Sequence, residues 1–125
     1  MKILVADDSK AMRMIVLRNL RQGGFDGATF IEAVDGADAL EKINAEKPDL
    51  VLSDWNMPNM SGIELCEALD HTNLVFGFVT SESTAEMRAL ADEAGSKFLI
   101  AKPFTPESFQ DILKDALAEA EAGKA

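Results

Sequence analysis

The sequence predicts an α/β domain of the (βα)5 type, in which five parallel strands alternate with five helices. Five short runs are almost entirely apolar, which is typical of strands covered on both faces of a parallel sheet. Each run is followed by a segment in which apolar residues recur at helical spacing. Because the two kinds of segment alternate along the chain, each helix is expected to cross over the sheet between parallel strands in the right-handed sense.

The first third of the chain predicts two strands and one helix. The run at 2–6 is the first strand, and a helix follows over 9–22 with its apolar residues on one side. Gly23 and Gly24 are expected to end that helix, because glycine readily takes the left-handed conformation found after helix C-termini. Residues 28–33 are expected to form the second strand.

The middle of the chain repeats this alternation. A helix is predicted over 36–45, and the apolar run at 50–53 is the third strand, buried on both faces. The next helix is expected over 61–70. Ser61 followed three residues later by Glu64 predicts a capping box at its start.

The fourth and fifth strands are predicted at 74–79 and 98–101, on either side of a helix over 84–94. Ser83 and Glu86 have the spacing of a second capping box, which predicts that Ser83 caps this helix.

The last helix is expected over 105–122. Thr105 is predicted to cap it, and Pro106 suits the first helical position, where its missing N–H costs nothing. A length of 125 residues suggests a single hydrophobic core. We therefore expect residues 1–125 to form one domain, with no output domain.

Composition and charge restrict the class of protein. A net charge of −10, from 12 basic and 22 acidic residues, argues against nucleic-acid binding, which requires cations to neutralise phosphates. No apolar stretch approaches the ~20 residues that span a bilayer, and the N-terminus lacks a signal peptide. The single Cys66 cannot form an internal disulfide and is expected in the core. These features indicate a cytoplasmic protein that does not bind membranes. The single histidine, His71, is expected at the protein surface.

Four of the predicted strands end in residues that can handle a phosphoryl group. Asp7 and Asp8 follow the first strand, and Asp54 follows the third. Thr80 ends the fourth strand and Lys102 follows the fifth. Ligands of open parallel sheets bind outside the carboxyl ends of the strands. We therefore expect three carboxylates, a hydroxyl and an ammonium group to converge there.

These side chains favour phosphoryl chemistry with a divalent metal. Like charges in one site either raise a pKa or recruit a cation, and Mg²⁺ prefers carboxylate oxygens and phosphate. A carboxylate can also attack phosphorus to form an aspartyl phosphate, whose oxygens the metal neutralises. Lys102 would then pair with one phosphoryl oxygen, and the Thr80 hydroxyl would donate to another.

The segments 5–9, 54–62, 79–80 and 102–104 resemble the receiver domains of two-component response regulators, in particular stand-alone chemotaxis regulators of the CheY type. The resemblance covers essentially the whole chain and implies a flavodoxin-like doubly wound sheet with strand order 2-1-3-4-5. It identifies Asp54 as the phosphoacceptor. It also implies that Mg²⁺ is held by Asp7, Asp8, Asp54 and the backbone carbonyl of Asn56.

The same resemblance assigns Thr80 and Lys102 to binding the phosphoryl group and reporting its arrival. Asn56 and Glu82 occupy the positions that tune hydrolysis of the acyl phosphate. Leu99 stands where the family has an aromatic residue that moves inward with the threonine. Since side chains alternate along a strand, the neighbouring Phe98 is expected to point to the opposite face. We therefore expect an altered readout at Leu99.

The resemblance implies a histidine kinase as phosphodonor. It also implies a protein target that docks on the helix 84–94, the strand 98–101 and the helix 105–122. The protein is thus expected to be a monomeric phosphorylation switch in chemotaxis-like signalling, and not an enzyme.

Several alternatives stay open. A phosphorelay intermediate or a phosphate sink fits the same residues. A Mg²⁺-dependent aspartyl-phosphate phosphatase would have Asp-x-Asp after its first strand and a cap insertion, whereas this chain has adjacent Asp7 and Asp8. A phosphate-independent binding module would lack part of the set of acidic residues, threonine and lysine, which is complete here.

Overall fold

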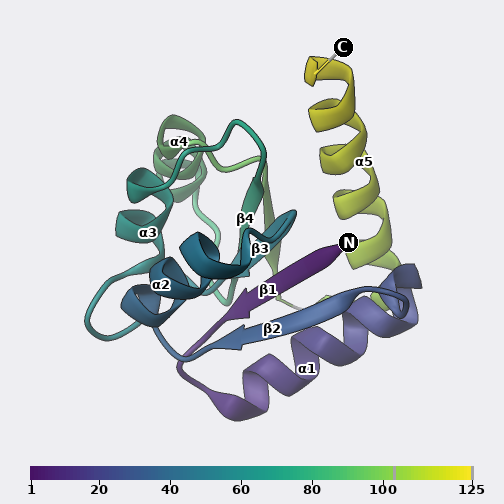
Figure 1. Ribbon diagram of the computed structural model, residues 1–125, viewed down its shortest axis with the longest axis horizontal. Helices are drawn as coiled ribbons and strands as arrows, with labels where there is room; N and C mark the ends of the chain where they lie inside the picture. The colour runs from purple at the N-terminus through teal and green to yellow at the C-terminus, as the bar shows by residue number, and fades with distance from the viewer. Residues whose placement is uncertain (103, 125) are drawn as a thin grey trace.

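The computed structural model is an open sheet of five parallel strands in the order β2-β1-β3-β4-β5, which confirms the predicted fold (Figure 1). It describes residues 1–102 and 104–124, the last four by their backbone alone. Each neighbouring pair of strands is parallel, as helical crossovers require. The strands are β1 (Lys2–Ala6), β2 (Thr29–Ala33), β3 (Leu50–Ser53), β4 (Val75–Thr80) and β5 (Phe98–Ala101).

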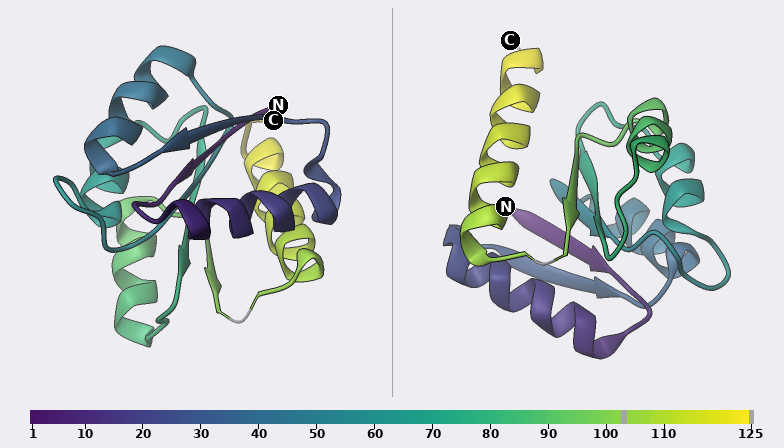
Figure 2. Two further views of the ribbon diagram at one scale, coloured as in Figure 1. Left: turned by 90° about the horizontal axis from the view of Figure 1, so that it is seen from below. Right: turned by 180° about the vertical axis from the view of Figure 1, so that it is seen from behind.

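Helices cover both faces of the sheet (Figure 2). One face carries α1 (Lys10–Leu20) and α5 (Pro106–Lys124). The other carries α2 (Gly36–Glu46), α3 (Gly62–Ala68) and α4 (Ala85–Ala94). Among the described residues, no helix combines the length and the apolar character that crossing a membrane requires.

The sheet separates two hydrophobic cores, and β1 contributes to both. Ile3 and Val5 lie in the core beneath α1 and α5, whereas Leu4 and Ala6 lie in the core beneath the other three helices. Successive side chains of a strand point to opposite faces, so a strand covered on both sides must be apolar at every position. This is why the strands appear in the sequence as uninterrupted apolar runs.

The predicted starts of α3 and α5 are confirmed. At α3, the Ser61 hydroxyl accepts from the Glu64 amide at 3.2 Å, and the Glu64 carboxylate accepts from the Ser61 amide at 3.1 Å. At α5, the Thr105 hydroxyl accepts from the Ser108 amide at 3.1 Å. Each cap satisfies amide groups that have no partner within the helix.

The predicted capping box at α4 is wrong. The N-cap is Thr84, whose hydroxyl accepts from the Met87 amide at 3.1 Å, and not Ser83. Thr84 has the extended backbone of an N-cap, with φ −106° and ψ 161°, so the helix begins one residue later than the spacing of Ser83 and Glu86 predicts.

The first helix ends at its predicted glycines, but its last turn is not α-helical. The α-helix stops at Leu20, and a single π-helical turn, η1 (Arg21–Phe25), follows it. Gly24 has φ 102°, in the left-handed region that glycine adopts without strain. A Cβ atom on Gly23 would lie 2.8 Å from the backbone oxygen of Pro106. The missing side chain therefore lets this turn pack against the start of α5.

His71, expected at the surface, is half-buried between α3 and α4. Its Nε2 lies 2.7 Å from the Cys66 carbonyl oxygen and donates to it, and its ring meets Phe76 edge-on at 6.0 Å. A Cβ atom on Gly95 would lie 2.8 Å from the histidine ring. The short connection from α3 to β4 turns His71 inward beneath the end of α4, so the surface prediction is wrong. Cys66 is fully buried, as predicted.

Candidate functional site

The carboxyl ends of four strands form a pocket of about 170 Å³. Asp54 directly follows β3, Thr80 is the last residue of β4, and Lys102 directly follows β5. This is the edge of the sheet where the sequence predicts that phosphate-handling side chains meet. The pocket is lined by Asp7, Asp8, Ser9, Met12, Asp54, Val79, Thr80, Ser81 and Lys102.

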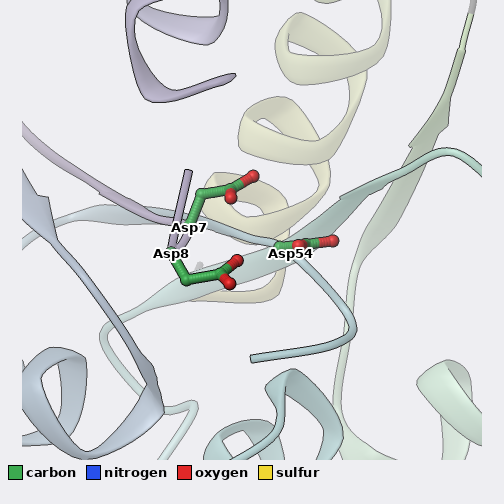
Figure 3. A group of neighbouring side chains, drawn as sticks. All are labelled: Asp7, Asp8 and Asp54. Atoms are coloured by element: carbon green, nitrogen blue, oxygen red, sulfur yellow. The ribbon is translucent and has the colours of Figure 1, made fainter. Parts of the chain in front are cut away.

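Three carboxylates lie together at this edge. One oxygen from each of Asp7, Asp8 and Asp54 lies within 4.8 Å of the others, and Figure 3 shows the side chains projecting from the ends of β1 and β3. Asp7 is 6% exposed, Asp54 is half-buried and Asp8 is exposed. Such a set of hard oxygen donors fits a divalent cation such as Mg²⁺.

Two hydrogen bonds to the backbone hold Asp7 in place, one made by its amide and one by its carboxylate. Its amide donates to the Ala33 carbonyl at 3.1 Å, and its carboxylate accepts from the Ser9 amide at 2.8 Å. Burial is the largest cause that raises the pKa of Asp7 from its ordinary 3.8 to about 6. The charges of Asp54 and Asp8 raise the pKa further, while the Ser9 amide opposes this. A bound cation would relieve this cost, which supports the fit of a metal to these residues.

Asp54 is fixed at the end of β3 by two backbone amides. Its own amide donates to the Ala6 carbonyl at 2.9 Å, and its carboxylate accepts from the Trp55 amide at 2.8 Å. Burial raises the pKa of Asp54 most, and the charge of Asp8 adds to it. The Trp55 amide and the Lys102 ammonium lower the same pKa.

Gly62 allows the turn after Asp54 to close. Its amide donates to the Trp55 carbonyl at 2.9 Å. A Cβ atom on Gly62 would lie 2.1 Å from the Asp54 carbonyl oxygen, so only glycine fits this close approach. The start of α3 therefore packs directly behind Asp54.

Thr80 and Lys102 face the same pocket from neighbouring strands. The Lys102 amide donates to the Thr80 carbonyl at 3.1 Å, which continues the pairing of β4 and β5 beyond the last residue of β5. The buried Thr80 hydroxyl accepts from the Glu82 amide at 3.3 Å, so its hydrogen stays available for another acceptor.

The structure also places the three residues predicted to modulate the site. Asn56 and Glu82 are exposed and follow Asp54 and Thr80 in the loops at the pocket, but they are not among the lining residues. Leu99 is half-buried beside the core under α2, α3 and α4, whereas Phe98 is buried in the opposite core. The predicted alternation of these two side chains is confirmed.

Arg13 is a residue of this region that the sequence did not reveal. Its Nη1 donates to the Asp7 carbonyl oxygen at 2.7 Å, and its Nε donates to the Glu32 carboxylate at 3.0 Å. The sequence pattern that corresponds to these contacts is a basic residue six positions after Asp7, together with an acidic residue in the adjacent strand β2. Neither half of that pattern is specific without the fold.

A larger pocket of about 510 Å³ lies at the opposite edge of the sheet, between the α3–β4 connection and α5. None of the described residues predicted to bind metal or phosphate lines it. The chemistry of the convergent side chains, and not pocket size, therefore identifies the candidate functional edge.

Comparison with known proteins gives one consistent family. The model of the response regulator receiver domain matches residues 3–114. The chain is 39% identical over 119 residues to chemotaxis protein CheY-3 of Vibrio cholerae, covering 90% of this chain and 88% of that protein. It is 34% identical over 122 residues to the alkaline phosphatase synthesis transcriptional regulatory protein PhoP of Bacillus subtilis, covering 96% of this chain. This chain spans only half the length of PhoP.

A solved structure gives the same result. The structure of chemotaxis protein CheY4 from Vibrio cholerae superposes with a TM-score of 0.81 at 29% identity, covering 92% of this chain and 97% of that one.

Proposed function

Because the chain belongs to the response regulator receiver family, we propose that it accepts a phosphoryl group on Asp54 from a histidine kinase and switches protein–protein interactions. The observation that carries this proposal is the pocket at the carboxyl edge, which gathers three carboxylates, one hydroxyl and one ammonium group from four strands. Phosphoryl transfer needs a nucleophile, charge neutralisation and positioned donors, and this pocket contains a candidate for each.

In the proposed transfer, a carboxylate oxygen of Asp54 attacks the phosphorus of a phosphohistidine. A P–O bond forms as the P–N bond breaks, and the electron pair leaves with the imidazole, which takes up a proton. The attacking carboxylate must be ionised. The Lys102 ammonium and the Trp55 amide favour that state because both lower the pKa of Asp54.

The proposed metal ligands are the carboxylates of Asp7, Asp8 and Asp54 and the backbone carbonyl of Asn56. The close approach of three carboxylates and the raised pKa of Asp7 support a cation at this point. When bound, Mg²⁺ supplies charge neutralisation for the transferring oxygens. Asp7 is held next to the end of β1 by its amide, which donates to the Ala33 carbonyl, and by its carboxylate, which accepts from the Ser9 amide.

Thr80 and Lys102 are proposed to sense the product. The Thr80 hydroxyl hydrogen can donate to a phosphoryl oxygen, and the Lys102 ammonium can pair with another. Because the Glu82 amide donates to the Thr80 hydroxyl, movement of Thr80 would carry the start of the β4–α4 loop with it. Asn56 and Glu82, on the two loops beside the pocket, are proposed to tune the lifetime of the phosphoryl group.

The proposed output surface consists of α4, β5 and α5, with Leu99 as the residue that reads the switch. The target is proposed to be a protein and not a nucleic acid, in keeping with the net charge of −10. Similarity to CheY-3 over most of both chains favours chemotaxis-like signalling by a monomeric receiver in the cytoplasm. A phosphorelay intermediate or a phosphate sink uses the same chemistry with a different recipient.

A direct test is incubation with acetyl phosphate and Mg²⁺, followed by intact mass spectrometry. We expect the mass of one phosphoryl group to be added to the protein, and none to be added to Asp54→Asn. Steady turnover of a generic phosphate ester would instead support the phosphatase alternative. No phosphorylation in either protein would contradict the proposal.

A further inference from the structure

We propose that Arg13 is a positioning residue for the metal site, because its guanidinium fixes the peptide group that joins Asp7 to Asp8. This inference rests on the proposed function of the acidic cluster. Arg13 lies in the fourth position of α1, and its side chain is only 11% exposed. Its charged group is thus directed inward, toward the end of β1, and not into solvent.

The guanidinium joins two parts of the structure. One nitrogen, Nη1, donates to the Asp7 carbonyl oxygen at 2.7 Å, and another, Nε, donates to a carboxylate oxygen of Glu32 at 3.0 Å. Glu32 lies in β2, the neighbour of β1. A planar guanidinium that bonds to two acceptors at once has little freedom left to rotate.

The Asp7 carbonyl lies just beyond the end of the sheet ladder. The register of β1 and β2 ends at Ala6 opposite Ala33, and the last bond beyond it is from the Asp7 amide to the Ala33 carbonyl. The next peptide group therefore lacks a neighbouring strand to fix its plane. Arg13 supplies the donor at this point.

This peptide plane determines how two metal ligands are presented. Its carbonyl belongs to Asp7 and its amide belongs to Asp8, so rotation of the plane would move the two carboxylates relative to each other. Asp8 is exposed, and its side chain interacts with the carboxyl groups of Asp7 and Asp54, whose like charges do not hold it in place. The backbone is therefore the main restraint on Asp8. Groups that orient metal ligands typically contribute about 10–100-fold to metal affinity.

Positioning can be distinguished from a simple effect of charge. Arg13 carries a positive charge close to a cation site, so loss of that charge alone would strengthen Mg²⁺ binding. Loss of a positioning group would weaken it. The two explanations predict changes of opposite sign in the same measurement.

The test is the Mg²⁺ affinity of Arg13→Met, measured by Trp55 fluorescence, with Arg18→Met as the matched control. Arg18 lies in the same helix and is exposed, so its substitution removes the same charge without touching Asp7. We expect binding by Arg13→Met to be about 10-fold weaker, and binding by Arg18→Met to be unchanged or slightly stronger. Arg13→Lys, which can reach only one of the two acceptors, should restore part of the loss.

One further readout does not depend on bound metal. Without metal, the amide nitrogen of Asp8 should shift in the NMR spectrum of Arg13→Met, because its peptide carbonyl has lost a donor. Glu32→Gln keeps an acceptor for Nε and should bind Mg²⁺ as the wild type does. Glu32→Ala, which releases the guanidinium, should bind more weakly and tests the same contact if Arg13→Met does not fold.

Unchanged or tighter Mg²⁺ binding by folded Arg13→Met would overturn the positioning role. Equal losses in Arg13→Met and Arg18→Met would overturn it as well, because the effect would then be independent of the Asp7 contact. Failure of the wild-type protein to bind Mg²⁺ would instead contradict the proposed function itself.

Discussion

The carboxylates of Asp7 and Asp54 come within 4.8 Å of each other at the carboxyl edge of the sheet, although one follows β1 and the other follows β3. The two strands are adjacent, and the Asp54 amide donates to the Ala6 carbonyl at 2.9 Å. Strand pairing therefore forces two like charges together. Burial is the largest cause that raises both pKa values; the charge of Asp54 adds to the rise at Asp7, and the charge of Asp8 adds to it at both groups. A cation would offset this cost.

The raised pKa of Asp7, caused mainly by burial, predicts how stability depends on pH. The pKa of Asp7 is about 6 in the folded protein and 3.8 ordinarily, so the folded state holds the proton more tightly. Its contribution to stability is complete below pH 3.8 and is lost as the pH rises through about 6. Urea unfolding without metal should show this loss in the wild type.

Asp7→Asn should not show that loss. Near neutral pH without metal, it should be more stable than the wild type by up to roughly 3 kcal/mol, since the pKa of Asp7 rises from 3.8 to about 6 and each pKa unit corresponds to about 1.4 kcal/mol. Asp35 is a suitable control because a hydrogen bond from the Asp38 backbone amide lowers its pKa. The contribution of Asp35 to stability therefore has the opposite pH dependence and is lost as the pH falls. An Asp7→Asn curve that falls with pH as steeply as the wild-type curve would contradict this account.

Metal binding should be visible through Trp55, the only tryptophan of the chain. Its amide bonds to the Asp54 carboxylate, and its ring packs on Phe78 with centroids 4.7 Å apart. Millimolar Mg²⁺ should therefore quench its fluorescence, and chelation should restore the signal. Asp8→Asn should need much more Mg²⁺ for the same change. An identical titration of this variant would argue that the metal binds elsewhere.

Gly77 should be intolerant of any side chain. A Cβ atom there would lie 2.2 Å from the ring of Phe98, which is buried across the β4–β5 pair. Gly77→Ala should lower the free energy of unfolding by about 1–3 kcal/mol through overpacking. Gly27→Ala is the matched control, because nothing lies within 4 Å of its Cβ position and its stability should hardly change. If Phe98→Leu does not relieve the Gly77→Ala defect, the clash is not its cause.

The conformational change on phosphorylation should be transmitted through Leu99, although this residue has no aromatic ring. Phe98 is buried on the other face against Gly77, so it cannot take the place of Leu99. Beryllofluoride with Mg²⁺ should shift the NMR signals of α4 and the Leu99 methyl groups. Thr80→Ala should abolish these shifts and keep those around Asp54. Shifts confined to the neighbourhood of Asp54 in the wild type would show that Leu99 does not report the switch.

Most of the fold and site could be predicted because they depend on periodicity and on strand ends. Asp7, Asp54, Thr80 and Lys102 each stand at the end of an apolar run, and parallel strands bring such ends to one edge. The residue that each strand contributes to the site could therefore be predicted from the local sequence at the end of that strand.

What could not be predicted depends on contacts between distant residues or on choices between near-equal alternatives. Ser83 and Thr84 are both good cap residues, and the backbone of the β4–α4 loop decides between them. His71 is turned inward by the short connection before β4. The contact of Arg13 with Asp7 and Glu32 exists only after α1 has packed beside β2.

The most direct measurement is the position of the phosphoryl group in the chain. After incubation with acetyl phosphate and Mg²⁺, borohydride reduction converts an acyl phosphate of aspartate to homoserine, which peptide mass spectrometry can locate. We expect homoserine at position 54 and at no other aspartate. Reduction at Asp7 or Asp8, or an unmodified Asp54 in phosphorylated protein, would contradict it.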